Sequence, residues 1–225
     1  MKQDQIAKHS TLQLILLHIL PGILITCFYL LARRPVANPG FPSVVALILA
    51  FAFILIPVEL GYLFYQGKKK TGRFTLQGII SYREAIPWWQ YLVWVSIIFI
   101  AAGAIFTWLK SVDALLQERL FSCMPEPGYG LDGTYSGQTL IVTYAMVFVF
   151  VAVQSPLVEE LYFRGYLLPR TKGKYATLVH SFLFAAHHFV TPWMLITRTL
   201  GLLSLLIAEK RRIYTLESAS IFCAI

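Results

Sequence analysis

The chain has 225 residues, of which 57% are hydrophobic and only 13% are charged, and its mean hydropathy is +0.66. A chain this apolar cannot cover a soluble globule with polar surface, and its apolar runs are long enough to cross a membrane, which takes roughly 20 helical residues. The net charge of +8 comes from short basic clusters between apolar runs, and no nucleic-acid-binding motif accompanies it. The composition therefore favours a membrane protein and argues against nucleic acid as a partner.

Six apolar runs are predicted to form transmembrane helices. In chain order they cover residues 11–32, 41–66, 88–109, 139–168, 175–194 and 199–208, and a further apolar stretch ends at residue 225. The first run is too long for a typical signal-peptide core and lacks an A-x-A cleavage site, so we interpret it as a retained helix. Residues 111–138 contain prolines, glycines and acidic residues and are expected to form one long loop outside the membrane. The predicted fold class is all-α: a single polytopic membrane helical bundle over residues 1–225, with about six to seven transmembrane helices.

The lysines and arginines divide unequally when successive loops are placed on opposite sides of the membrane. With the N-terminus inside, most of them fall on the inner side, and five fall outside: Arg33, Arg34, Lys110, Arg119 and Arg198. Cytoplasmic loops carry the basic excess, so we expect a cytoplasmic N-terminus. The compact chain suggests a bacterial protein, and hence a place in the inner membrane. Two amphipathic segments, at 76–80 and 112–120, are expected to lie at the membrane interface.

Ionisable residues inside apolar runs cost about 2.5–3.5 kcal/mol each on insertion scales and must be paired or face a wet cavity. In the segment SPLVEELYFRGYLLPR, Glu160 and Arg164 are spaced i, i+4 and are expected to form an intramembrane ion pair. Glu159 lies about 100° around the helix from Glu160. It therefore has no local cation, which suits a general base that activates water. Pro156 is expected to kink this helix and to open space for water.

The next run contains HSFLFAAHHF, in which Phe184 and His188 lie one turn apart on one helical face. Helical rise places Glu159 and His188 on antiparallel neighbours with an offset of about 5 Å, which predicts a water-activating dyad. Each part alone has a simpler interpretation, because a Glu–Arg pair often only packs helices and a single histidine often only donates a hydrogen bond. We interpret Glu59 as a residue that reaches the inner interface, with a place lining the site as the less favoured alternative, and His18 and His180 as packing or interfacial residues. It is the presence of the Glu–Arg pair, Glu159 and His188 at the same depth in the membrane that favours a catalytic role.

The sequence Glu159-Glu160-x-x-x-Arg164 followed by Phe184-x-x-x-His188 resembles the first two motifs of the CAAX-protease and bacteriocin-processing family. That family includes the type II CAAX prenyl endopeptidases, and the resemblance covers about residues 139–225. It implies an all-helical membrane fold with a cavity open to the cytoplasm. It also implies that Glu159 activates water with help from His188, supported by the other three motif residues, in a mechanism without a metal or cofactor. The zinc-binding sequence H-E-x-x-H is absent from the chain.

The family has a third motif, a histidine followed four residues later by asparagine or a similar residue, which is thought to stabilise the oxyanion. Here the stretch LESASIFCAI leads towards that place and ends at Ile225, so the chain is expected to be truncated at this motif and less active.

The leading hypothesis is an intramembrane endopeptidase that acts on a peptide or a membrane protein. The alternative is a non-catalytic member, such as a bacteriocin-immunity or scaffold protein. A small transporter with Glu59 and Glu159 as proton carriers is disfavoured, because no inverted repeat is visible. Prenylation of the substrate and the oligomeric state are left open.

Overall fold

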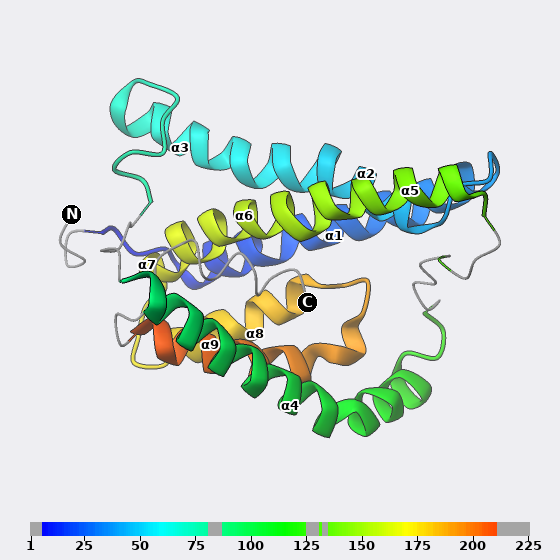
Figure 1. Ribbon diagram of the computed structural model, residues 1–225. Helices are drawn as coiled ribbons and strands as arrows, with labels where there is room; N and C mark the ends of the chain where they lie inside the picture. The colour runs from blue at the N-terminus through cyan, green and yellow to red at the C-terminus, as the bar shows by residue number, and fades with distance from the viewer. Residues whose placement is uncertain (1–5, 81–86, 125–130, 132–134, 211–225) are drawn as a thin grey trace.

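The computed structural model describes residues 6–80, 87–124, 131 and 135–210, and within these ranges it contains helices and no strand (Figure 1). This confirms the predicted all-α fold. In chain order the elements are α1 (Thr11–Ala37), α2 (Val44–Ala50), η2 (Phe51–Leu60), α3 (Gly61–Thr71), α4 (Trp88–Leu120), α5 (Gly137–Met146), η3 (Val147–Gln154), α6 (Ser155–Glu159), η4 (Glu160–Leu167), α7 (Leu168–Arg170), α8 (Ala176–His187), η5 (Pro192–Met194) and α9 (Leu195–Lys210).

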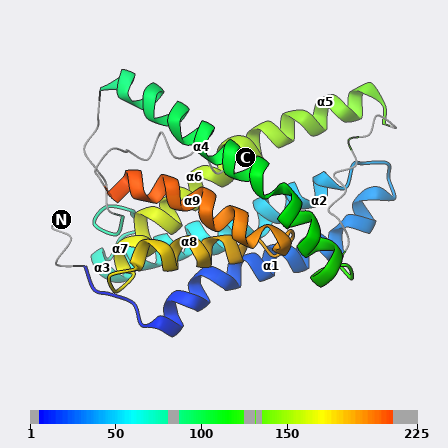
Figure 2. The ribbon, with the colours of Figure 1, turned by 90° about the horizontal axis from the view of Figure 1, so that it is seen from below.

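Four of the described helices are long and apolar enough to cross a membrane. They are α1, the continuous helix Val44–Thr71, α4, and the continuous helix Gly137–Arg170, while α8 is a shorter apolar helix. By length and composition the chain is a polytopic membrane protein, as the sequence predicts. The helices form two groups, with α1, α2–α3 and α5–α7 side by side, and α4, α8 and α9 covering one side of them (Figures 1 and 2). The two groups contact each other where α8 packs against α1. Within the second group, α9 packs against both α8 and α4.

The helix α4 extends beyond the predicted run. α4 continues through residues 111–120, which were predicted to lie in a loop, because neither glycine nor proline interrupts the sequence between Gly103 and Pro125. Its 33 residues span roughly 50 Å, well over the hydrocarbon thickness of about 30 Å. Near its end, the Asp113 carboxylate accepts a hydrogen bond of 2.7 Å from the Thr197 hydroxyl of α9. The segment 112–120 is thus the end of a spanning helix rather than a separate interfacial one.

A proline inside α1 creates a docking point for the helix Gly137–Arg170. Pro21 has no N–H, so the carbonyl of Leu17, four residues earlier, lacks its usual partner within the helix. The Tyr162 hydroxyl donates a hydrogen bond of 2.8 Å to this carbonyl. In membranes, a backbone group freed by proline is commonly satisfied by a neighbouring helix in this way. The position of Tyr162 is thereby fixed against α1.

The same region of α1 also receives α8. The His187 Nδ1 donates a hydrogen bond of 3.0 Å to the His18 carbonyl. Gly22 permits this approach, because a Cβ at this position would lie 1.9 Å from the His187 carbonyl oxygen. The helix Gly137–Arg170 and α8, both distant in sequence from α1, therefore contact the same region of α1.

The end of the segment 76–80 packs against the protein core. Ile79 and Ile80 are buried in a cluster with Leu63 and Tyr166, and the segment is not helical. The Arg170 guanidinium donates through Nη2 to the Ile79 carbonyl at 3.0 Å. The helix expected at this position is therefore wrong, and Ile79 and Ile80 pack on the protein core.

Candidate active site

The ion pair expected from the sequence is present at the start of η4. Arg164 Nη1 donates to Glu160 Oε2, and both side chains are buried. The pair spans one helical turn and is buried by neighbouring helices, so neither charge faces lipid alone. The helix itself continues through Pro156, with π-helical segments on either side of it, η3 and η4. Such wider turns absorb the break that a proline makes in the hydrogen-bond ladder.

Glu159 is the last residue of α6 and lies on a different side of the helix from the ion pair. Its side chain is buried, and its Oε1 accepts a hydrogen bond of 3.3 Å from the Ser155 hydroxyl. Its neighbour Val158 packs with Leu55 of η2, and Glu159 is close enough to Glu59 for an electrostatic interaction. Glu59 is fully buried within the protein. The helix that carries Glu59, Val44–Thr71, packs against α6, which carries Glu159.

His188 lies just beyond the end of α8, so the run predicted to continue to residue 194 stops earlier. The cause is Pro192, because in a continued helix its ring would clash with the carbonyl of His188, four residues before it. The His188 Nδ1 lies 3.0 Å from the Phe184 carbonyl. Since a carbonyl only accepts, Nδ1 carries the hydrogen and Nε2 is the basic nitrogen. The rings of Phe184 and His188 are 5.0 Å apart, as their one-turn spacing predicts.

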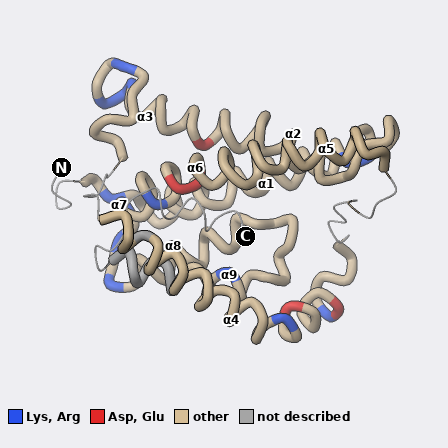
Figure 3. The backbone as a smooth tube through the Cα atoms, in the orientation of Figure 1, with Lys and Arg blue, Asp and Glu red and all other residues tan. Residues whose placement is uncertain are grey.

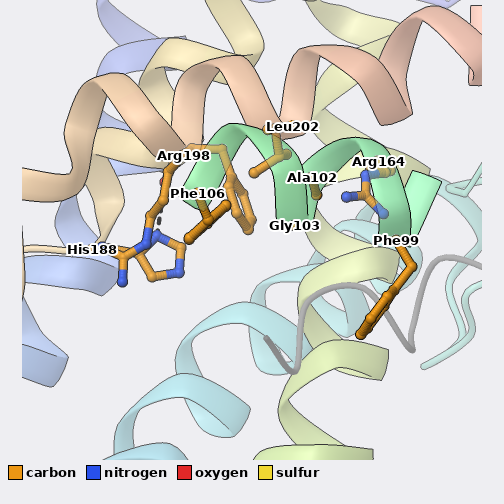
Figure 4. A pocket seen from close by; sticks show the side chains of 10 residues that line it. Phe99, Ala102, Gly103, Phe106, Arg164, His188, Arg198 and Leu202 are labelled. Atoms are coloured by element: carbon orange, nitrogen blue, oxygen red, sulfur yellow. Dashed lines mark hydrogen bonds between the residues drawn. The ribbon is translucent and has the colours of Figure 1, made fainter. Parts of the chain in front are cut away.

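His188 and Phe184 line a cavity of about 150 Å³ that Arg164 also reaches (Figure 4). Figure 4 shows His188 beside Arg198 at one end, and Arg164 with Phe99 at the other. The remaining lining residues are mostly apolar: Ala102, Gly103, Phe106, Gly201 and Leu202. The structure therefore brings Arg164, Phe184 and His188 to one cavity. Glu159 is not among the lining residues and lies on the neighbouring side of its helix.

Arg198 is a site residue that the sequence analysis missed. It was assigned to the outer side of the membrane, but it lies in the first turn of α9 and lines the cavity beside His188. Its Nη1 donates to the Thr191 hydroxyl at 2.6 Å and to the Thr191 carbonyl at 3.2 Å. The turn between α8 and α9 creates this position. The one signal for that turn in the sequence is Pro192.

Three further histidines form a hydrogen-bonded group beside the site. His18 Nδ1 donates to the Leu14 carbonyl at 2.8 Å, so its Nε2 accepts from His180 Nδ1 at 3.0 Å. His187 donates to the His18 carbonyl, and all three rings are buried. These contacts agree with packing roles for His18 and His180. Within the part of the chain that the structure describes, no group of three or more His, Cys, Asp or Glu residues is placed to hold a metal ion.

The fold and this site define a helical membrane protein with a buried polar centre between its spans. Residues 141–222 match the family model described as Type II CAAX prenyl endopeptidase Rce1-like. The matched segment contains Glu159, Glu160, Arg164, Phe184 and His188, and its last part, 211–222, lies outside the described residues. The match covers less than half of the chain and supports its assignment to the CAAX protease family. No curated protein and no solved structure gives a significant match.

Proposed function

We propose that this protein is an intramembrane endopeptidase in which Glu159 activates water and His188 assists. The observation that carries the proposal is the cavity shared by Arg164, Phe184 and His188, next to a helix turn that buries Glu159. The family match over both motifs supports proteolysis as the chemistry. The stretch LESASIFCAI, which leads towards the third motif of the family, lies outside the described part of the chain.

The proposed reaction is hydrolysis of a peptide bond in an apolar site. The Glu159 carboxylate accepts a proton from water while the water oxygen bonds to the scissile carbonyl carbon, and the same carboxyl then gives that proton to the leaving nitrogen. The His188 Nε2 accepts a hydrogen bond from the water and orients it. The ion pair of Glu160 and Arg164 fixes the helix turn that carries Glu159. The substrate must therefore enter between η4 and α8 to reach both groups.

Cleavage of a membrane-anchored reporter peptide by the purified full chain in proteoliposomes tests this mechanism. Glu159→Gln and His188→Ala should each lower kcat by about 10²–10⁴-fold, the usual contribution of general acid–base catalysis. Glu118→Gln is the matched control, because this carboxylate is exposed on α4, away from the cavity. Circular dichroism would verify that the variants are folded. Cleavage that is unchanged in both site variants would refute the proposal.

We further propose that the protein resides in the cytoplasmic membrane of a bacterial cell with its N-terminus inside, and that its substrate is a peptide or a membrane protein. Figure 3 shows lysines and arginines gathered at the end of the molecule that holds the N-terminus, the end of α3 and α7. Cytoplasmic loops carry such an excess. A cysteine at Asn38 should react with an impermeant maleimide in intact cells, whereas one at Lys69 should react only after lysis. The reverse pattern would exclude this orientation.

A further inference from the structure

Glu59 is a buried acid that the proposed mechanism leaves unused. It lies within the spanning helix Val44–Thr71 and has no solvent-exposed surface. Neither of its carboxyl oxygens has a hydrogen-bond partner among the described residues. An ionised carboxylate in such a place would lose its hydration and gain no bond in return. The environment therefore favours the neutral acid.

The packing of two parallel helices places Glu59 opposite Glu159. The helix Val44–Thr71 and the helix Gly137–Arg170 run in the same direction (Figure 1). Leu55 packs with Val158, and one to two turns further along the Tyr62 ring lies 6.0 Å from the Tyr162 ring. Along its helix, Glu59 lies between Leu55, which makes the first of these contacts, and Tyr62, which makes the second.

Glu159 falls in the same interval of its own helix, directly after Val158. The two carboxyl groups accordingly interact electrostatically. The other titratable group that faces Glu59 is Tyr162, whose hydroxyl already donates to the Leu17 carbonyl. Among the described residues, no lysine or arginine forms an ion pair with Glu59. Two negative charges side by side in this apolar interior would repel each other.

We propose that Glu59 and Glu159 form a carboxyl pair that holds one proton, with the proton on Glu59 and the negative charge on Glu159. The asymmetry follows from the hydrogen bonds. The Ser155 hydroxyl donates to Glu159, and donation to a carboxylate favours its charged form. Glu59 receives no such bond from a described residue.

Glu59 is then a positioning residue, because its proton keeps Glu159 as the ionised member that is ready to accept a proton from water. When Glu159 takes that proton both carboxyls are neutral, and the pair returns to one proton when the leaving nitrogen is protonated. This consequence for catalysis rests on the proposed peptidase function. The shared proton itself is a property of the folded chain and does not rest on it.

Infrared spectroscopy of the full chain in lipid tests the pair without any substrate. Near neutral pH the wild type should show the carbonyl stretch of a protonated carboxyl, and this band should vanish in Glu59→Gln. It should remain in Glu159→Gln and in the control Glu118→Gln. Glutamine imitates the neutral acid in shape, so Glu59→Gln should fold, and Glu59→Asp should retain the band as a second variant. A band that persists unchanged in Glu59→Gln would overturn the proposal.

The pH dependence of the same band tests whether the two carboxyls interact. With Glu159 present, its charge opposes a second charge, so the wild-type band should persist to a higher pH than the band of Glu159→Gln. An identical dependence in the two proteins would show independent groups and refute the pair. In the reporter assay, Glu59→Gln should remove the change in cleavage rate at high pH that arises when deprotonation of Glu59 places a second charge beside Glu159, whereas a purely structural role would lower the rate at every pH alike. If the wild type cleaves no peptide, the peptidase proposal fails, and the infrared result still decides the pair.

Discussion

The helix Val44–Thr71 and the helix α4 are both apolar and of similar length, yet they occupy different surroundings. In the most apolar window of each, 44% of the residues of Val44–Thr71 are buried by protein, against 11% for α4. The first helix carries Glu59 in its interior, whereas α4 has no charged residue between Trp88 and Leu109. The intramembrane charges of this protein thus lie where neighbouring helices cover them. α4 meets the site only with apolar side chains.

The largest effect expected from this contrast concerns the covered ion pair. Arg164→Leu leaves Glu160 buried without its cation and should destabilise the protein by about 3–5 kcal/mol, the usual cost of breaking a buried pair. The double variant Glu160→Gln, Arg164→Leu should regain much of this loss, because no charge is then left alone. Reversible unfolding in mixed micelles, followed by circular dichroism, measures the difference.

The control for that prediction lies on α4. Arg119 is exposed near the end of this helix, and Arg119→Leu should stay within about 0.5 kcal/mol of the wild type. If Arg164→Leu and Arg119→Leu lowered the free energy of unfolding equally, burial would not explain where the charges lie.

A smaller effect is expected from paired glycine substitutions on the two helices. A Cβ on Gly67 would lie 1.9 Å from the Thr75 carbonyl oxygen, whereas a Cβ on Gly103 of α4 would meet nothing within 4 Å. Gly67→Ala should therefore cost about 1–3 kcal/mol through overpacking, while Gly103→Ala should be neutral or stabilising by up to about 1 kcal/mol through helix propensity. The same unfolding assay compares them. Equal effects would mean that Val44–Thr71 is no more tightly packed than α4.

The smallest effect is expected outside both helices, at His9. Partial burial and the nearby Arg170 charge lower the pKa of His9 from its ordinary value of about 6.5. The unfolded chain therefore binds the proton more strongly, so the contribution of His9 to stability is present above about pH 6.5 and is lost as the pH falls below it. His9→Gln should reduce the loss of unfolding free energy between neutral and mildly acidic pH. A pH dependence equal to that of the wild type would exclude this role.

Local spacing predicted the parts of the site that lie on one helix. The i, i+4 pair of Glu160 and Arg164 and the one-turn contact of Phe184 with His188 need only the geometry of a helical turn. The apolar runs likewise predicted the all-α membrane fold, because hydrophobic length alone determines what crosses a bilayer.

Contacts between distant segments were not predictable in this way. Glu59 meets Glu159, and Arg198 meets His188, only because particular helices pack side by side. No periodicity within one segment encodes such packing. The end of α8 at His187 has a different cause, since the proline that stops the helix lies five residues further on, inside the apolar run, and acts through the carbonyl of His188. Similarly, the composition of residues 111–138 suggested a loop, although the sequence has no helix breaker before Pro125.

The hydrogen bond between Tyr162 and the Leu17 carbonyl also bears on how the protein is assembled during synthesis. Proteins are made from the N-terminus, so α1 enters the membrane long before Tyr162 exists, and until then the carbonyl exposed by Pro21 lacks this partner. An unsatisfied backbone group in hydrocarbon costs several kcal/mol. The first span of the chain therefore reaches its final environment only after the helix Gly137–Arg170 has been inserted beside it.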